Sequence, residues 1–142
     1  MFEKMMKILA NDGISQSGID ALGKRGFEII TTKVAQNQLE NYINEHTIDA
    51  ILVKNATQVR QELIDACPSI KLIGVLGVGM DNIDAEYAED QGLYVINAPE
   101  ASASSVAELV FAHLFGLARF LHASNREMPL EGDSRFKELK KA

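Results

Sequence analysis

Residues 72–84, Leu-Ile-Gly-Val-Leu-Gly-Val-Gly-Met-Asp-Asn-Ile-Asp, carry the pattern that decides the fold. An apolar run suited to a buried strand meets three glycines and gives way at once to the polar pair Asp81–Asn82. Glycine adopts positive φ at little cost and has no side chain to keep a ligand away, so successive N–H groups can turn toward one anion. The pattern predicts a strand that ends in a backbone loop. It leaves open whether this loop binds an anion or is only a tight turn.

The segments on either side of this stretch alternate between the apolar pattern of strands and that of helices. Runs typical of strands cover residues 7–11, 27–32, 50–53, 72–76 and 93–96. Between them, helix-like patterns lie around residues 19–22, 37–43, 57–64 and 85–90. Strands that alternate with helices at this spacing form a parallel sheet covered on both faces. The expected fold class is therefore α/β, with a five-stranded parallel sheet.

Particular residues predict where these helices begin and end. Gly26 is expected to end the first helix as a C-cap, a position that glycine often occupies. Asn37 and Glu40 have the spacing of a capping box for the second helix, and Thr57 is placed to cap the third. These residues predict the bounds of three helices.

Polar residues and glycines gather where the predicted strands end. Ligands of open parallel sheets bind at the carboxyl ends of the strands, where the strand order reverses. Those ends are here Asn11–Asp12, Lys54–Asn55, 77–79 and 97–99. The lysine and the glycine loop make this edge of the sheet suited to a carboxylate or a phosphate.

After Pro99 the pattern changes to one long apolar helix. Ser105 and Glu108 have capping-box spacing, and the helix they open is expected to run to about His122. Large apolar side chains lie on more than one side of it, so one neighbouring surface cannot bury them all. We therefore expect a homodimer or larger oligomer through residues 106–122.

Residues 125–142 are expected to form an arm, with a short amphipathic stretch around Phe136 and Leu139. The domain organisation expected is thus a sheet domain at 1–100, a hinge helix at 101–124 and an arm at 125–142. A further domain is expected to follow this arm.

Composition limits the functions that remain. Hydrophobic residues make up 46% and charged residues 24% of the 142 residues, as in ordinary globular proteins. A net charge of −6 gives no basic footprint for nucleic acid or an anionic membrane. Cys67 is the single cysteine, expected to be a small buried apolar residue, and no metal cluster is expected. With no signal-peptide pattern and no apolar run long enough to span a bilayer, the expected location is the cytoplasm.

Particular residues argue against two other functions, a dinucleotide-binding site and a phosphorylated receiver domain. Gly77 and Gly79 begin a dinucleotide fingerprint, but Asn82 holds the position of its third glycine. A phosphorylated receiver domain needs an aspartate where Lys54–Asn55 stands, and only Asp12 remains of its acidic cluster. A lone acid at a strand end is more often a turn residue or a helix cap.

Four motifs in register resemble the D-isomer-specific 2-hydroxyacid dehydrogenases over nearly the whole chain. They are residues 53–57 (Val-Lys-Asn-Ala-Thr), 77–84 (Gly-Val-Gly-Met-Asp-Asn-Ile-Asp), 97–99 (Asn-Ala-Pro) and 105–108 (Ser-Val-Ala-Glu). The resemblance implies a flavodoxin-like substrate-binding domain followed by the helix that crosses into an NAD-binding domain.

The same resemblance implies roles for individual residues. The residues expected to face the carboxylate of a 2-hydroxy acid are Lys54, Asn55, Leu76, Gly77, Val78 and Gly79. On the cofactor side, Asn97 and Val106 are expected near the hinge, with Val106 nearest the nicotinamide. The sequence departs from the family pattern at Lys54, Asn55 and Val75, where Arg, Ser and Arg are usual. Lysine keeps the positive charge but loses the bidentate fork of arginine.

The family's nucleotide-binding glycines and its catalytic Arg, Glu and His do not match any residue of this chain. His46, His113 and His122 are expected to be structural or solvated, so no catalytic residue is predicted. The leading hypothesis is a substrate-binding fragment of an NAD-dependent oxidoreductase that is inactive alone. The alternative is a non-catalytic small-molecule-binding or dimerisation module with the same fold.

Overall fold

The computed structural model describes residues 5–131, which divide into a sheet unit up to Ala101 and a helical unit from Ser102. The strands of the sheet unit are β1 (Lys7–Ala10), β2 (Glu28–Ile30), β3 (Ala50–Val53), β4 (Leu72–Val75) and β5 (Tyr94–Ile96). Its helices are α1 (Gln16–Gly23), the 3₁₀ turn η1 (Gln36–Gln38), α2 (Leu39–His46), α3 (Gln61–Ala66) and α4 (Ala85–Asp90). The helical unit contains α5 (Ala103–Ala118) and α6 (Leu121–Glu131).

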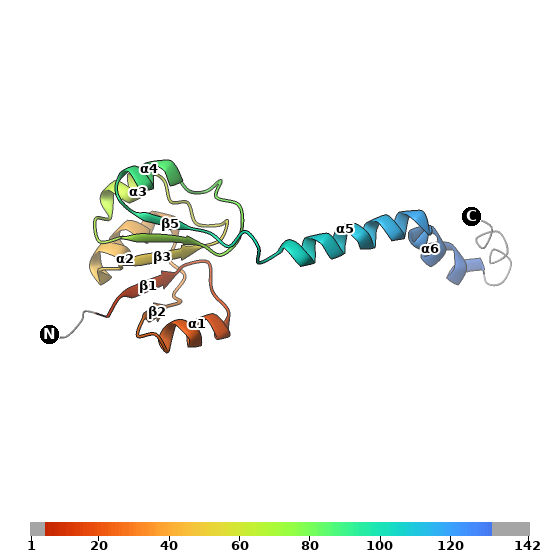
Figure 1. The fold of residues 1–142 in the computed structure, drawn as a ribbon, viewed down its shortest axis with the longest axis horizontal. Coiled ribbons are helices and arrows are strands. Elements are labelled where there is room, and N and C mark those ends of the chain that lie inside the picture. The colour runs from red at the N-terminus through yellow and green to blue at the C-terminus, as the bar shows by residue number, and fades with distance from the viewer. Residues whose placement is uncertain (1–4, 132–142) are drawn as a thin grey trace. The chain divides into compact units, whose positions relative to one another are not determined.

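All strand pairs are parallel, and the order across the sheet is β2-β1-β3-β4-β5 (Figure 1). The predicted α/β class with five parallel strands and a flavodoxin-like order is confirmed. The order reverses between β1 and β3, since the chain goes outward from β1 to β2 and then returns to the other side of β1. Such a reversal opens a crevice at the carboxyl ends of the strands.

The two faces of the sheet are covered unequally. On one face, Leu39 and Ile43 of α2, Ile64 of α3 and Ala88 of α4 pack with the central strands in a large buried cluster. On the other face, a smaller cluster joins the strands to Leu22 of α1 and its flanking residues. The central strand β3 is buried at all four positions, as expected for a parallel strand covered on both sides.

Cys67 lies in the larger cluster with 1% of its surface exposed, as predicted for a small apolar residue. Burial, with a smaller contribution from Glu40, raises the pKa of its thiol to about 11. The thiol is therefore protonated and unreactive at neutral pH.

Several predicted helix caps are wrong. α2 begins without any side-chain cap, because the η1 turn precedes it and replaces the expected Asn37–Glu40 box. Thr57 does not cap α3, since its hydroxyl donates to Asp12 and the helix begins only at Gln61. The first turn of α3 is instead capped from another segment, where the Asp84 carboxylate accepts from the Gln61 N–H at 3.0 Å.

The cap at the end of α1 is displaced by a few residues. The helix ends at Gly23 with Lys24 as its C-cap, and Gly26 takes the left-handed φ of 85° two residues later. At its start, Ser15 accepts a hydrogen bond from the Gly18 N–H, a cap that the sequence analysis missed.

The long helix is shorter than predicted and is followed by a second one. α5 begins at Ala103, before the expected Ser105–Glu108 box, and no side chain caps it. It ends at Ala118, because Phe120 adopts a left-handed φ of 53° that breaks the helix. The start of the predicted arm belongs to α6, and Phe136 and Leu139 lie outside the described residues.

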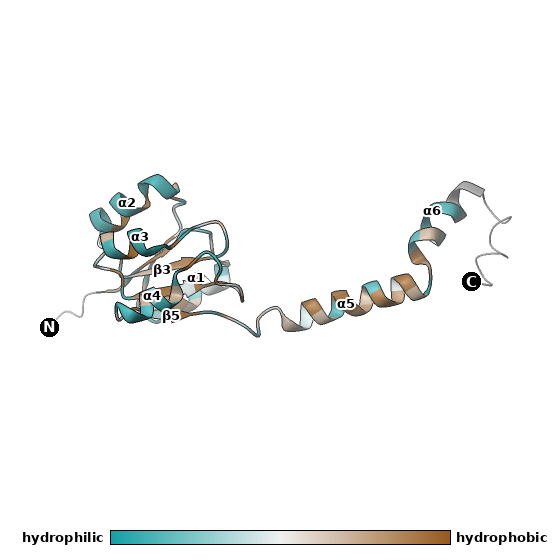
Figure 2. Ribbon diagram, turned by 90° about the horizontal axis from the view of Figure 1, so that it is seen from above, coloured by the Kyte–Doolittle hydropathy of each residue, from teal (hydrophilic) through white to brown (hydrophobic). Residues whose placement is uncertain are grey.

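None of the described side chains of α5 is buried, and Figure 2 shows hydrophobic residues along its whole length. No single described helix is long and apolar enough to cross a membrane. Taken together, α5 and residues 121–127 have the length and the composition of a span, with a bend of 60° between them.

Candidate functional site

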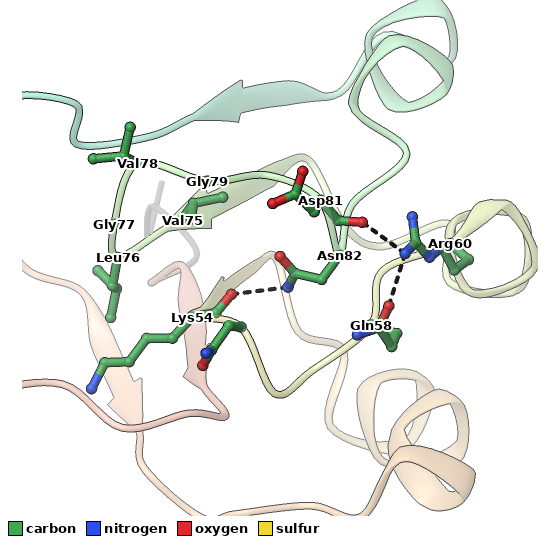
Figure 3. Close-up of a pocket in the computed structure, with 11 residues that line it drawn as sticks. Lys54, Gln58, Arg60, Val75, Leu76, Gly77, Val78, Gly79, Asp81 and Asn82 are labelled. Atoms are coloured by element: carbon green, nitrogen blue, oxygen red, sulfur yellow. Dashed lines mark hydrogen bonds between the residues drawn. The ribbon is translucent and has the colours of Figure 1, made fainter.

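A cleft of about 410 Å³ opens at the carboxyl ends of β3 and β4 (Figure 3). The loop after β4 forms one wall, and the turn after β3 forms the other. The residues that line it are Lys54, Asn55, Gln58, Arg60, Val75, Leu76, Gly77, Val78, Gly79, Asp81 and Asn82. All six residues predicted to face a substrate are among them.

The two residues predicted on the cofactor side do not line this cleft. Asn97 lies just beyond β5, where its side-chain amide donates to the Val78 carbonyl at 3.0 Å. Val106 belongs to α5 in the helical unit. Their predicted contact with a nicotinamide stays a prediction.

The glycines of the loop at 77–79 do not adopt the positive φ that glycine allows. Neither Gly77 nor Gly79 adopts a left-handed φ. Gly77 faces open space, where an added Cβ would meet nothing within 4 Å, so packing does not require glycine at this position. Gly74, inside β4, packs closely against β3, because a Cβ there would lie 2.5 Å from Cδ2 of Leu52 and that side chain would have to shift.

The backbone of this loop presents unpaired donors. Its start is fixed where the Leu76 N–H donates to the Val53 carbonyl at 2.8 Å, and the Gly77 carbonyl accepts from Ala98 at 2.9 Å. Among residues 5–131, no group accepts a hydrogen bond from the N–H of Gly77, Val78 or Gly79. These three N–H groups are free to bind an anion.

The turn after β3 is held by two buried or half-buried polar side chains. Asp12 accepts hydrogen bonds from the N–H groups of Lys54 (2.7 Å) and Thr57 (3.1 Å) and from the Thr57 hydroxyl (2.7 Å). From the opposite side, the buried amide of Asn82 donates to the carbonyls of Lys54 (2.9 Å) and Thr57 (2.6 Å). Asp12 is therefore a turn residue, the commoner role for a lone acid at a strand end.

The environment of Asp12 keeps it ionised. Burial alone raises the pKa of this carboxyl, but hydrogen bonds from the Thr57 side chain and from the N–H groups of Lys54, Thr57 and Ala56 together lower it below its ordinary value of 3.8. Asp12 therefore holds the turn as a charged acceptor, whose hydrogen bonds are stronger than those of a neutral group.

Lys54 is exposed, and within the described part of the chain its ammonium forms no ion pair or hydrogen bond. Figure 3 shows its side chain extending past Leu76, on the side away from Asp81. Lys54 thus adds an unpaired positive charge to the lining of the cleft.

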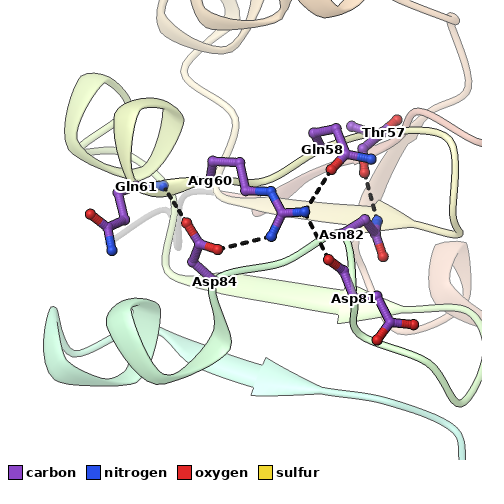
Figure 4. Close-up of polar contacts among 7 residues, drawn as sticks. All are labelled: Thr57, Gln58, Arg60, Gln61, Asp81, Asn82 and Asp84. Carbon is purple, nitrogen blue, oxygen red and sulfur yellow. Dashed lines mark hydrogen bonds and ion pairs between the residues drawn. The ribbon is translucent and has the colours of Figure 1, made fainter.

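A second cation, Arg60, lines the cleft but is already paired. Its guanidinium donates to the Asp84 carboxylate (2.9 Å), to the Gln58 side chain (2.9 Å) and to the Asp81 carbonyl (2.8 Å), as Figure 4 shows. Hydrogen bonding from Arg60 lowers the pKa of Asp84, against a smaller opposing effect of burial. The sequence analysis missed Gln58, Arg60, Asp81 and Asn82 as cleft residues, although the last two stand inside its central motif.

None of the histidines lies in the cleft. His46 stacks on Tyr42 with ring centroids 4.0 Å apart, and His113 and His122 lie on the helical unit. Within the described residues, no group of His, Cys, Asp and Glu side chains could hold a metal ion. What the cleft offers is the N–H groups of the glycine loop and a lysine for an anion, beside the neutral amides of Asn55 and Gln58 and the exposed carboxylate of Asp81.

Residues 8–128 match the family described as D-isomer specific 2-hydroxyacid dehydrogenase, catalytic domain. The chain belongs to this family. A D-3-phosphoglycerate dehydrogenase of Bacillus subtilis is 38% identical over 122 residues, which are 85% of this chain and 22% of that protein. A hydroxypyruvate reductase of Thermotoga maritima is 33% identical over 116 residues, 81% of this chain and 37% of that protein.

Among solved structures, an acyclic imino acid reductase in complex with NADPH and D-Arg has a TM-score of 0.74 and 26% identity. The similarity covers 91% of this chain and 42% of the reductase. The chain thus corresponds to the substrate-binding domain of D-2-hydroxyacid dehydrogenases, a family that uses NAD(P), and it spans less than half the length of these relatives.

Proposed function

We propose that this chain is the substrate-binding part of an NAD-dependent oxidoreductase that acts on the CH–OH group of a D-2-hydroxy acid. The specific enzyme we propose is D-3-phosphoglycerate dehydrogenase of serine biosynthesis, in line with the Bacillus subtilis relative. The observation that carries the proposal is the cleft, which is lined both by the glycine loop with its three unpaired N–H groups and by Lys54, whose ammonium has no described partner.

The carboxylate of the acid would bind to the N–H groups of Gly77, Val78 and Gly79. Backbone donors favour an ionised acceptor and need no reorganisation, which makes such bonds stronger than those between neutral groups. Lys54 adds a point charge without the planar fork of arginine, so it attracts a carboxylate or a phosphate without fixing its orientation. Asn55 and Gln58 are placed for the uncharged oxygens of the substrate.

The glycine loop at 77–82 does not have the pattern of a dinucleotide site. Asn82 replaces the third glycine of a fingerprint, and its amide is committed to Lys54 and Thr57. The Asn97 amide is likewise engaged with Val78. We propose that NAD is the cofactor of the longer enzyme, with Val106 near the nicotinamide, and that this chain alone holds only the acid.

We also propose that the protein is a homodimer or larger oligomer through residues 106–122. The supporting observation is that the large apolar side chains of α5 are all more than half exposed, from Leu114 at 54% to Leu117 at 77%. The lone buried Cys67 fits a reducing compartment, and we place the enzyme in the cytoplasm.

A specific observation also favours the second candidate, a non-catalytic binding or dimerisation module. Its support is the same exposed apolar surface of α5 together with a cleft that no histidine lines. Such a module would bind an anion in the cleft without preferring a 2-hydroxy acid.

A ligand panel distinguishes the two candidates. Dissociation constants of the chain would be measured by calorimetry for D-3-phosphoglycerate, L-lactate, hydroxypyruvate and inorganic phosphate. We expect D-3-phosphoglycerate to bind most tightly, and Lys54→Gln to weaken it while Lys24→Gln, a change of an exposed lysine at the end of α1, does not. Equal affinities for all four anions, or equal effects of the two lysine variants, would favour the module.

A further inference from the structure

The glycine loop is held at both of its ends. At the start, Ala98 and Asn97 donate to the carbonyls of Gly77 (2.9 Å) and Val78 (3.0 Å). At the far end, Arg60 donates to the carbonyl of Asp81 at 2.8 Å. Between these points, no described acceptor binds the N–H groups of residues 77–79. The two ends therefore determine where these N–H groups lie.

Arg60 joins the turn before α3 to two positions of the segment at 81–84. One nitrogen, Nη1, donates to Asp84 at the start of α4, and the other, Nη2, donates to Gln58 before α3 and to Asp81 in the loop. The planar guanidinium sets these directions together, which a single ammonium cannot do. Asp84 is itself fixed, because its second carboxylate oxygen accepts from the Gln61 N–H at 3.0 Å.

The backbone on both sides of Arg60 strengthens this connection. The Val59 N–H donates to the Asn82 carbonyl at 2.9 Å, and the Asp84 N–H donates to the Val59 carbonyl at 3.0 Å. Residues 59 and 83 thus form a parallel bridge outside the main sheet. The Arg60 bond extends this connection to Asp81, and within the loop the Ile83 N–H donates to the Met80 carbonyl at 2.9 Å. Figure 4 shows the guanidinium directed at this carbonyl and at Asp84.

We propose that Arg60 is a positioning residue, which fixes the far end of the glycine loop and thereby the N–H groups that bind the substrate carboxylate. This inference rests on the proposed function of the cleft. Arg60 acts through the Asp81 peptide and not as a second cation for the ligand, because Asp84, Gln58 and Asp81 already occupy its fork.

The two possible roles of Arg60 predict opposite effects of changing Asp84. Removal of a negative charge near the cleft should strengthen anion binding if the charge of Arg60 is what attracts the ligand. If Arg60 positions the loop, Asp84→Ala should weaken binding, because the guanidinium loses the partner that orients it. Asp90→Ala, an exposed carboxylate at the end of α4, is the matched control.

The test uses the whole chain labelled with ¹⁵N. In the ligand-free protein, Arg60→Gln and Arg60→Lys should both shift the amide signals of Gly77, Val78 and Gly79, while Arg25→Gln, a change of an exposed arginine, should not. Titration with D-3-phosphoglycerate should show affinity about tenfold lower for Arg60→Gln, Arg60→Lys and Asp84→Ala. Circular dichroism verifies that each variant is folded.

The outcomes separate this inference from the proposed function. If the wild-type chain does not bind D-3-phosphoglycerate, the proposed function fails, and the inference about substrate positioning fails with it. If the wild type binds, unchanged loop amides in Arg60→Gln would overturn the inference alone. Full affinity of Arg60→Lys, or tighter binding by Asp84→Ala, would also overturn the inference, because it would show that a positive charge at residue 60 is enough for binding. If Arg60→Gln does not fold, the affinities of Arg60→Lys and Asp84→Ala for D-3-phosphoglycerate test whether Arg60 positions the loop.

Discussion

The carboxylate of Asp12 accepts a hydrogen bond of 2.7 Å from the hydroxyl of Thr57, which lies 45 residues later in the sequence. This contact joins the end of β1 to the turn after β3 and holds the backbone that presents Lys54. The same hydroxyl accepts from the buried Asn11 amide at 2.9 Å, so two polar residues at the end of β1 share it. The orientation of the turn therefore depends on a negative charge in its interior.

Asp12→Asn should destabilise the chain at neutral pH and have less effect in acid. The pKa of Asp12 is lowered in the folded state, so its stabilisation is present above the unfolded-state pKa and is lost as the pH falls through the folded pKa. At pH 7 we expect a loss of about 1 kcal/mol in unfolding free energy, discounted for partial exposure. Urea unfolding at a series of pH values from 7 to 3 measures this difference in unfolding free energy, with Asp90→Asn as the control.

A loss that stays constant over this pH range would show that the Asp12 charge is not what holds the turn. A loss equal to that of Asp90→Asn would show that the turn does not need Asp12.

Asn82→Ala should be more destabilising than a typical surface change. It leaves the carbonyls of Lys54 and Thr57 without their donor in a buried place, which costs about 2 kcal/mol. Asn37→Ala is the matched control, since Asn37 is exposed and makes no helix cap. Denaturant midpoints that are equal for the two variants would contradict the role given to Asn82.

The chain alone should neither bind NADH usefully nor reduce or oxidise a 2-hydroxy acid. It has no third glycine in the loop at 77–82 and no histidine in the cleft to carry a proton. Calorimetry with NADH and an absorbance assay with D-3-phosphoglycerate and NAD measure this. Micromolar NADH affinity or turnover above background would be the contrary result.

Self-association should occur through the large aromatics of α5. Phe111 and Phe115 are more than half exposed, with ring centroids 6.2 Å apart, and each such side chain gains about 1.5–3 kcal/mol on burial. Light scattering at micromolar concentration should report at least twice the 15.6 kDa chain mass. Phe111→Ser with Phe115→Ser should lower it, whereas Ser104→Ala, on the same helix, should not.

A folded monomer before mutation would contradict self-association. Loss of the protein from solution into lipid vesicles would instead assign the apolar surface of α5 to a membrane.

The sheet could be predicted from the sequence because each strand carries its own local signal. Residues 50–53 are apolar throughout, and the run at 72–75 ends at a visible break, so strand positions needed no tertiary information. Ligands of parallel sheets bind at the carboxyl ends of the strands, which predicts the edge where the cleft lies. The six predicted substrate residues line that cleft because they stand directly after two neighbouring strands.

Caps and connecting side chains could not be predicted in the same way, because their partners are distant in sequence. Thr57 has the local pattern of an N-cap, but Asp12 takes its hydroxyl once β1 and β3 are side by side. Arg60 shows no motif, and its role emerges only where α3 meets the loop at 81–84. The break at Phe120 likewise has no local signal, since neither proline nor glycine occurs at residues 117–121.

The most direct test of the central claim is the position of the bound carboxylate. ¹⁵N amide signals of the wild-type chain would be followed during titration with D-3-phosphoglycerate, with sodium chloride at equal ionic strength as the control. We predict that the amides of Gly77, Val78 and Gly79 shift most and in a saturable manner, and that Lys54→Gln weakens the response. Shifts confined to other parts of the chain, with these three amides unmoved, would contradict the assignment of this cleft as a substrate site.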